Sequence, residues 1–284
     1  MALTDGLISA YKLDETSGDV IDSHGTNDGT NNGATRGATG KDGNAFDFDG
    51  NDDYVDLGKS PNELFSSGGF SISGWLKPDS FNDWQAFYNI GGIYFFYCLI
   101  GNNGDIVYKI NSNMGSASSV VSLDTWHHIS VTWDGSDLRL YVDGDLKDTQ
   151  SDSEVLPNRN LFIGARNYGG DRNFNGKIDE VYIWDRALTS SEISDLASGS
   201  FYLFSVSATY SANPLTLSLS KQEPDFRLKV QSVDLNSNIA FKKVSIIVKE
   251  PQRPLFPFSV TQSIGTGEIR KDRWKLNDRT FGTG

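Results

Sequence analysis

Short runs of alternating apolar and polar residues, each closed by a glycine- or aspartate-rich turn, dominate residues 5–198. Examples are "GLISAYKL", "FSISGWLKP" and "NLFIGA". Alternation with a period of two places every second side chain on one face of a β-strand. Two such runs meet at Asp134-Gly135-Ser136 and predict a hairpin. Because the chain has 29 glycines and few helical patterns, we expect an all-β fold.

The chain divides into regions that differ in strand pattern, proline content and charge. After Gly199 five further alternating runs follow, separated by prolines at 214, 224, 251, 254 and 257. We expect a first domain over residues 1–200, a smaller β-rich domain over 201–264 and a basic extension over 265–284. No internal repeat of 20–50 residues is evident.

One short helix is predicted at the end of the first domain. Thr189 and Glu192 have the spacing of a capping box, in which each side chain bonds a backbone N–H of the other residue. Leu188 and Ile193 can form the accompanying hydrophobic staple. The helix should run from about residue 190 to 197 and end near Gly199.

Charge is distributed unevenly along the chain. The formal net charge of −12 combines −17 over residues 1–200 with +5 over residues 201–284. An acidic domain repels phosphate, so nucleic acid is not expected as a partner. The basic end predicts docking onto an acidic protein surface, and a solvated tail is the alternative. The docking residues would be Arg270, Lys271, Arg273, Trp274 and Lys275.

Cysteine content and targeting segments limit the possibilities further. The one cysteine, Cys98, lies in the apolar run "GGIYFFYCLIG", so an internal disulfide is excluded and a buried hydrophobic role is expected. The N-terminus lacks the basic and apolar regions of a Sec signal peptide. No segment approaches the roughly 20 apolar residues of a membrane span. We therefore expect a soluble chain, without membrane partners, that acts outside the cell or on a virion surface.

Five motifs in order resemble one known family. They are "GLISAYKLDETSGDVIDSHG", "FDFDGNDDYVDLG", "FSISGWLKP", "WHHISVTWDGSDLRLYVDG" and "FNGKIDEVYIWDRALTSSEI". Together they resemble the LamG-like, concanavalin A-like lectin/glucanase jelly-roll family. The resemblance implies two antiparallel sheets packed face to face, one of them concave. Residues 201–284 lie outside it.

The resemblance also implies a structural calcium ion near the start of the last strand. Strict alternation in "GKIDEVYIW" places Asp179 on the same face as Val181 and Ile183, where an unpaired carboxylate would be costly. Asp179 could instead bind calcium together with the loop "DSHGTNDG". The ligands would be Asp22, Asn27, Asp28 and Asp179, with backbone carbonyl groups.

Two alternatives to calcium remain open at Asp179. Backbone amides could satisfy the carboxylate, or an arginine such as Arg186 could pair with it. The loop also departs from the family's usual "DSSGNGNDG", because His24 replaces a serine and one residue is missing.

A sugar site requires aromatic rings for C–H faces and polar groups for hydroxyls. Two segments, "DSFNDWQAFYNIGGIYFFY" and "GARNYGGDRNFNG", supply both. The alternative is that the aromatic residues fill the core. The predicted ligand-binding residues are Trp84, Tyr88, Arg166, Asn167, Tyr168 and Arg172.

Catalysis is not expected. Retaining glycosidases need two carboxylates roughly 5–5.5 Å apart, and no "ExDxxE" pattern occurs here. Adjacent residues on a strand face opposite ways, which separates Asp179 from Glu180 and His127 from His128. The two histidines are expected to pack within the strand rather than share a metal.

Three functional hypotheses follow. The first is a non-catalytic adhesion or display protein whose head binds a glycan or surface ligand. Its C-terminal region would anchor it to a larger assembly, such as a phage capsid decoration, fibre or tail, and a homo-oligomer is possible. The second is a purely structural assembly subunit. The third is a glycoside hydrolase accessory domain or degenerate glucanase.

Overall fold

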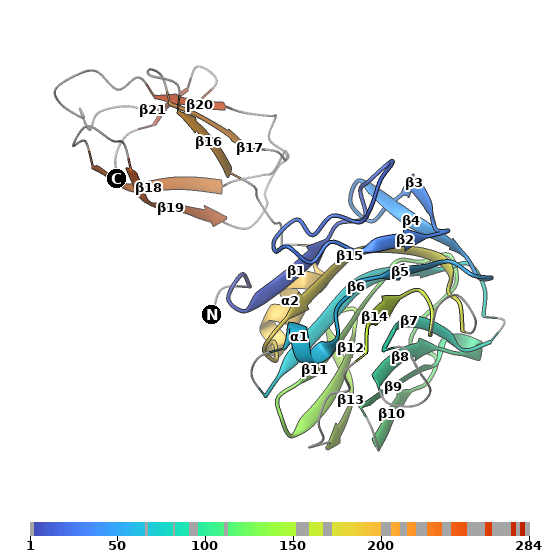
Figure 1. Ribbon diagram of the computed structural model, residues 1–284. Coiled ribbons are helices and arrows are strands. Elements are labelled where there is room, and N and C mark those ends of the chain that lie inside the picture. Colours follow the sequence, from blue (N-terminus) through green and yellow to red (C-terminus); the bar gives the residue numbers. More distant parts are fainter. Residues whose placement is uncertain are drawn as a thin grey trace. The chain divides into compact units, whose positions relative to one another are not determined.

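The computed structural model divides the chain into two units, Met1–Phe201 and Tyr202–Gly284 (Figure 1). In the first unit it describes residues 3–199 except 66–67, 82, 91–95, 111–112, 152–158 and 167–171. In the second unit it describes the backbone of seven strands. Side-chain burial is described for the first unit alone, and the candidate functional site lies there.

The first unit is a sandwich of two antiparallel sheets (Figure 1). The eight-stranded sheet has the order β13-β12-β11-β6-β15-β4-β3, and β1 pairs with β15. Its strands are β1 (Leu7–Tyr11), β3 (Thr35–Thr39), β4 (Asn44–Asp49), β6 (Phe70–Pro78), β11 (His127–Trp133), β12 (Asp137–Val142), β13 (Asp145–Ser151) and β15 (Asn175–Trp184).

The second layer of the sandwich is a seven-stranded sheet of order β10-β9-β8-β7-β14-β5-β2. The two layers confirm the predicted all-β, concanavalin A-like jelly-roll fold. The strands of this sheet are β2 (Thr30–Asn32), β5 (Tyr54–Asp56), β7 (Gln85–Ile90), β8 (Phe96–Ile100), β9 (Ile106–Ile110), β10 (Asn113–Ala117) and β14 (Leu161–Ile163).

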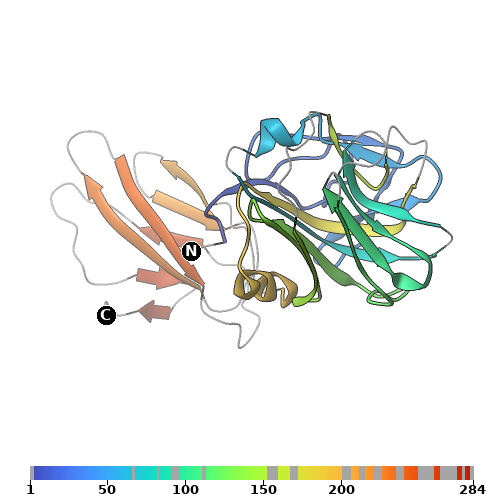
Figure 2. The ribbon, with the colours of Figure 1, turned by 90° about the horizontal axis from the view of Figure 1, so that it is seen from below.

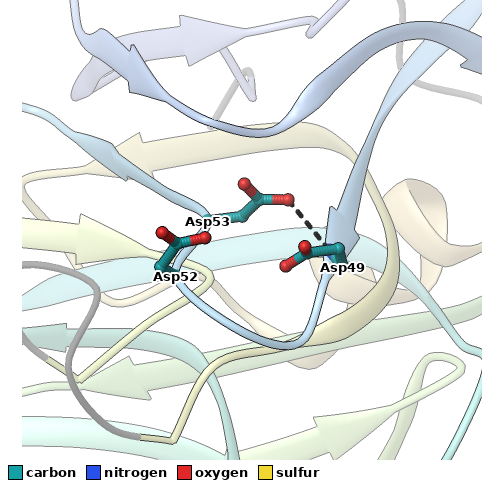
Figure 3. A group of neighbouring side chains, drawn as sticks. All are labelled: Asp49, Asp52 and Asp53. Atoms are coloured by element: carbon teal, nitrogen blue, oxygen red, sulfur yellow. Dashed lines mark hydrogen bonds between the residues drawn. The ribbon is translucent and has the colours of Figure 1, made fainter.

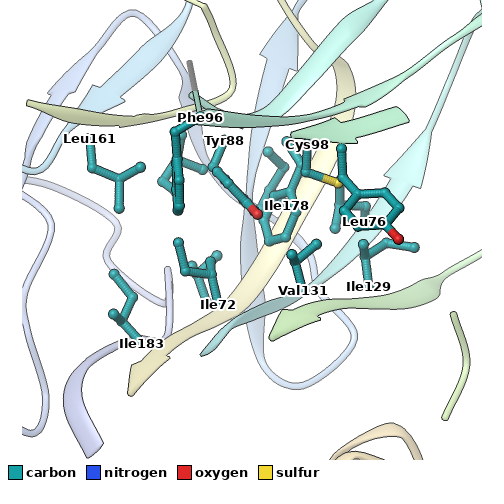
Figure 4. Close-up of a cluster of buried hydrophobic side chains, with 14 of the residues drawn as sticks. Ile72, Leu76, Tyr88, Phe96, Cys98, Ile129, Val131, Leu161, Ile178 and Ile183 are labelled. Atoms are coloured by element: carbon teal, nitrogen blue, oxygen red, sulfur yellow. The ribbon is translucent and has the colours of Figure 1, made fainter. Parts of the chain in front are cut away.

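The inner faces of both sheets form one apolar core. In Figure 4, Ile72 and Ile183 of the eight-stranded sheet face Phe96 and Leu161 of the other. Each such side chain contributes about 1.5–3 kcal/mol when fully buried. Cys98 is 0% exposed within this core, as the sequence predicted.

A β-bulge in β15 determines which of its side chains face the core. The register with β6 shifts directly after Asp179, and Glu180 has a left-handed φ of 47°. Ile178, Val181 and Ile183 consequently belong to the core, whereas Asp179 does not. The prediction that Asp179 shares a face with Val181 and Ile183 is therefore wrong, because an extra residue in the strand breaks the alternation that it assumed.

Helix α2 (Ser190–Ala197) begins with the predicted capping box. The Thr189 hydroxyl accepts the Glu192 N–H at 3.3 Å, and the Glu192 carboxylate accepts the Thr189 N–H at 2.9 Å. The helix lies beside the eight-stranded sheet (Figure 2). The hydroxyl groups of Tyr141 in that sheet and Ser190 in the helix lie 3.2 Å apart. The other helical segments are α1 (Pro61–Leu64) and the 3-10 turn η1 (Asn102–Gly104).

None of the helices in the described ranges is long and apolar enough to cross a bilayer.

The second unit contains a five-stranded sheet, β16-β17-β20-β21-β22, and the separate hairpin β18-β19. Two of these strands lie in the last 20 residues, where the sequence predicted an extension. The bounds are β16 (Val206–Tyr210), β17 (Leu215–Leu219), β18 (Phe226–Asp234), β19 (Ala240–Val248), β20 (Ser259–Gln262), β21 (Trp274–Leu276) and β22 (Arg279–Phe281).

Of the predicted docking residues, Trp274 and Lys275 lie in β21, which pairs with β20 and β22. Arg270, Lys271 and Arg273 lie outside the described residues.

Candidate functional site

Trp84, a predicted ligand residue, lies on the outer face of the seven-stranded sheet. Its partly exposed indole packs against an apolar cluster that is separate from the main core. A Cβ added at Gly101 would lie 2.5 Å from the Trp84 ring, so the glycine allows the indole to lie against the end of β8. The cluster consists of Ala86, Tyr97, Leu99 and Val107.

Two of the predicted arginines belong to segments that flank the same strand, β7. The Ala86 N–H donates to the Arg172 carbonyl at 2.8 Å. On the Arg166 side, Gly164, which lies two residues before Arg166, donates its N–H to the Phe87 carbonyl at 3.0 Å. Arg172 has a left-handed φ of 55°. Its Nη1 atom is buried and has no hydrogen-bond partner among the described residues.

The other two residues predicted in that segment, Asn167 and Tyr168, lie outside the described residues. The structure therefore brings the backbone at Arg172 next to the strand that follows Trp84, and it describes part of the predicted ligand site.

Tyr88 is wrongly assigned to the ligand site. It is 1% exposed and lies in the main core, with its ring 5.3 Å from those of Phe87 and Phe96. Burial raises the pKa of its hydroxyl well above the ordinary value. The register of β7 with β8 shifts between Ala86 and Tyr88, which turns both Phe87 and Tyr88 inward.

The same bulge returns Asn89 to the outer face, a position that sequence reasoning missed. Asn89 pairs with Phe162 of β14 on one side and with Tyr97 of β8 on the other. Its side chain is 0% exposed. The signal that could have identified it is an amide inside an otherwise apolar strand, "QAFYNI".

Three of the predicted metal residues come together in the loop that follows β1. The Asp28 carboxylate accepts the Asp22 N–H at 2.8 Å, and the Asn27 carbonyl accepts the Tyr11 hydroxyl at 2.7 Å. The Asp22 carboxylate accepts backbone N–H groups of Ala10, His24, Gly25 and Asn27 at 2.9, 3.1, 2.9 and 3.1 Å. Burial opposes ionisation of Asp22, but these four amides outweigh it and lower its pKa.

Asp179, the fourth predicted metal residue, is bound to a different loop. Its Oδ2 atom accepts the N–H groups of Lys41 and Asp42 at 2.7 and 3.0 Å, and its Oδ1 atom accepts the Glu180 N–H at 2.8 Å. Burial raises its pKa to about 7, although these amides act in the opposite direction. Arg186 does not take this role, because its guanidinium pairs with Glu192.

The predicted metal residues are therefore divided between two loops. At Asp22 and Asp179 the carboxylate oxygens already face converging N–H donors, which repel a cation, so these two groups do not fit calcium. Of the alternatives left open by the sequence, backbone amides are the ones that satisfy Asp179.

An acidic triad brings three further carboxylates together (Figure 3), although both oxygens of Asp49 already accept hydrogen bonds from Asn51, at 2.8 and 2.9 Å. One carboxylate oxygen from each of Asp49, Asp52 and Asp53 lies within 4.8 Å of the others. The turn between β4 and β5 brings them together, with the Asp53 carboxylate accepting the Asp49 N–H at 2.9 Å. Burial and neighbouring negative charge raise the pKa of Asp53. Carboxylate oxygens are the ligands that calcium prefers.

A Ser–His–Asp chain of contacts also occurs, at the start of β11. The His127 Nδ1 atom lies 2.7 Å from Asp143, and its Nε2 atom lies 2.9 Å from the Ser122 hydroxyl. The backbone N–H of Ser122 donates to the same Nε2 atom at 3.0 Å. Because that amide already occupies the lone pair that a catalytic base would need, His127 caps the turn that precedes β11.

His128 is buried beside Trp75, at 5.3 Å between ring centroids, and burial lowers its pKa to about 4. The two histidines therefore have separate surroundings and do not form a shared metal site.

Comparison with known sequences gives matches that each cover about a third of this chain. A human protein, adhesion G-protein coupled receptor D1, is 33% identical over 104 residues, which are 34% of this chain and 12% of that protein. A rat protein, sushi, von Willebrand factor type A, EGF and pentraxin domain-containing protein 1, is 28% identical over 114 residues, 36% of this chain and 3% of that protein. The chain therefore spans only a small part of these relatives.

Solved structures share the fold at low sequence identity. Domain 4 of AbnA, a GH43 extracellular arabinanase from Geobacillus stearothermophilus in complex with arabinotriose, has a TM-score of 0.53 and 24% identity, covering 67% of this chain and 98% of that one. The binding domain of Paraclostridial Mosquitocidal Protein 1 has a TM-score of 0.57 and 16% identity, covering 98% and 82%. Trypanosoma rangeli sialidase has a TM-score of 0.58 and 17% identity, covering 69% and 33%.

A family model provides the assignment. The model for Laminin_G_3, described as the concanavalin A-like lectin/glucanases superfamily, matches residues 49–194, just over half of the chain. This span contains the bulges of β7 and β15, the acidic triad and Trp84, and the family's fold agrees with the two-layered sandwich described above. The chain therefore belongs to the concanavalin A-like lectin/glucanases superfamily.

Proposed function

We propose that the chain is a non-catalytic adhesion or display protein that binds a glycan or cell-surface ligand on the outer face of the seven-stranded sheet. The observation that carries this proposal is the partly exposed indole of Trp84, supported from below by Gly101. A supported aromatic ring contacts the C–H face of a sugar, and guanidinium groups bond its hydroxyls. Arg166, Asn167, Tyr168 and Arg172 are the proposed polar and aromatic neighbours.

The similarity of this fold to a domain solved with arabinotriose supports a saccharide as ligand. A non-catalytic role is supported by the Ser122–His127 geometry, in which a backbone amide blocks the imidazole.

The test is a glycan-array screen of the full-length protein in calcium buffer, with circular dichroism as proof of folding. Trp84→Ala should lose at least tenfold in affinity for the sugars bound by the wild type, because the stacking surface is removed. Trp126→Ala is the matched control, since Trp126 is also partly exposed but precedes β11 of the other sheet. A blank array with folded protein would contradict glycan binding and favour a structural subunit with protein-only contacts.

We also propose a calcium site formed by Asp49, Asp52 and Asp53 in place of the predicted group of Asp22, Asn27, Asp28 and Asp179. The convergence of three carboxylate oxygens supports the triad. The ion would link the ends of β4 and β5 across their turn and neutralise like charges that repel one another.

We propose further that the second unit anchors the protein to a larger assembly, such as a phage virion, at an extracellular or virion surface. The opposite charges of the two regions support a protein partner for the basic end, where Arg270, Lys271, Arg273, Trp274 and Lys275 cluster. Deletion of residues 265–284 should leave the first unit folded but prevent incorporation into the assembly. Normal incorporation of the shortened protein would exclude this role.

A second candidate function is that of a glycoside hydrolase accessory domain. It is favoured by the match of 67% of this chain to nearly the whole of domain 4 of an arabinanase. Binding of the same sugar by Trp84 would be common to both functions, and co-purification with a hydrolase would distinguish them.

A further inference from the structure

The side-chain amide of Asn89 lacks an explanation in packing alone. The side chain is 0% exposed, and neither its oxygen nor its nitrogen has a hydrogen-bond partner within the described ranges. A buried polar group without a partner costs about 1–3 kcal/mol of folding free energy. Buried polar groups in native proteins are nearly always bonded, so an exception points to a ligand, a water molecule or a functional requirement.

Asn89 lies between two aromatic residues on the outer face of the sheet. Phe162 is its cross-strand partner in β14 and Tyr97 is its partner in β8. Tyr97 in turn belongs to the apolar cluster against which Trp84 packs. The amide and the proposed Trp84 platform therefore lie on one continuous face, with Ala86 between them on β7.

The chemistry of an amide flanked by aromatic rings matches a saccharide. The rings can contact apolar C–H groups, and the amide presents one donor and one acceptor side by side. Two neighbouring hydroxyl groups of a sugar ring offer the complementary acceptor and donor. A purely apolar ligand would leave the amide unpaired, and an anion would meet its carbonyl oxygen.

We propose that Asn89 is a specificity-determining residue that bonds a vicinal pair of hydroxyls on an uncharged saccharide once the side chains that cover its amide move aside. This inference rests on the proposed function and deepens it by naming the ligand class and the group that recognises it. The unpaired amide then lowers the stability of the free protein, and it is explained by its role in binding the ligand.

The test uses the full-length protein and the sugars that bind the wild type on the array. Asn89→Leu is close to isosteric and removes both polar atoms, so its Tm should equal or exceed that of the wild type while its affinity falls at least tenfold. The wild type should also discriminate against analogues in which one of two adjacent hydroxyls is replaced by hydrogen, and Asn89→Leu should lose that discrimination.

Ser73→Ala is the matched control, because Ser73 is likewise 0% exposed, with a hydroxyl that has no hydrogen-bond partner in the described part of the chain, but lies on the other sheet. Its affinity should equal that of the wild type. If Asn89→Leu fails to fold, Asn89→Ala serves for the same comparison. Equal affinity of the folded Asn89 variant and the wild type overturns this inference alone. A blank array for folded wild type overturns the proposed function and this inference together.

Discussion

At the scale of single residues, backbone N–H groups hold two buried carboxylates, Asp22 and Asp179. Asp22 accepts four such hydrogen bonds and has a lowered pKa, whereas Asp179 accepts three and has a pKa raised to about 7. The difference follows from burial, since Asp179 is 0% exposed and loses more hydration. The two groups therefore respond to pH in opposite directions.

The wild type is expected to be more stable than an Asp179→Ala variant, and this advantage should be larger at acid pH than at neutral pH. The pKa of Asp179 in the folded protein, about 7, lies above the value of 3.8 for an ordinary aspartate. The stabilisation by the protonated form is therefore complete below pH 4 and is lost as the pH rises through 7. Chemical denaturation between pH 4 and 8 should show the wild-type advantage shrinking. An advantage that grows with pH would show that the ionised form is preferred.

Calcium is expected to raise the Tm of the wild type through the acidic triad. Asp52→Asn should remove most of that rise, because Asp52 is exposed and contributes a ligand without supporting the fold. Asp179→Ala should lower Tm equally in calcium and in chelator, because it leaves three amides without an acceptor at a cost of about 3 kcal/mol. Asp19→Asn, at an exposed position outside the triad, is the control. Identical melting curves in calcium and chelator would exclude the ion.

At the scale of elements, α2 is short and depends on its first turn. Glu192 closes the capping box with Thr189 and receives two hydrogen bonds from Arg186 at 2.9 and 2.7 Å. Burial opposes ionisation of this carboxyl, but the bonds from Arg186 and Thr189 outweigh it and lower its pKa to about 2. An eight-residue helix is marginal by itself, so these contacts and the buried Ile193 keep it in place.

Glu192→Gln is expected to destabilise the first unit by about 1–2 kcal/mol, because it weakens the cap and removes the charge that Arg186 pairs with. Since the folded-state pKa lies below 4.5, the contribution of Glu192 is present above pH 4.5 and disappears as the pH falls towards 2. Urea denaturation at pH 7 and pH 3 should show a smaller difference at the lower pH. Asp195→Asn, an exposed acidic position in the same helix, should change little.

Several elements were readable from the sequence, and the bulges were not. "FSISGWLKP" matches β6 residue for residue, and Thr189 with Glu192 predicted α2, because alternation and capping are local signals. The bulges at Phe87 in β7 and at Glu180 in β15 depend on how neighbouring strands pair. Alternation alone therefore placed Asp179 beside the core, and it indicated neither the burial of Tyr88 nor the outward position of Asn89.

At the scale of the whole molecule, the first unit closes its own sandwich. The edge strands β10 and β13 of the two sheets are joined by Asp148, whose carboxylate accepts the Tyr108 hydroxyl at 3.1 Å and the Ser116 N–H at 2.8 Å. Gly115 leaves room for the Tyr108 ring, since an added Cβ there would lie 2.3 Å from it. Closure and a single continuous core indicate a unit that folds independently.

A protein ending at Phe201 is accordingly expected to fold cooperatively and to melt at the temperature of the corresponding transition in the full chain. The division between units falls at Phe201 and Tyr202, and the core and closure described above lie before it. Differential scanning calorimetry of both proteins is the measurement. A truncated protein that lacks a cooperative transition would show that the second unit is needed for stability.

Because Cys98 is buried between the two sheets, its reactivity reports how often the sandwich opens. Its thiol is shielded from solvent, and burial raises its pKa far above the ordinary value, so the reactive thiolate is absent while the sheets stay together. Since the chain contains one cysteine, every molecule labelled by a thiol reagent reports an excursion in which the two layers separated. The rate of thiol labelling under native conditions therefore measures the population of the open state.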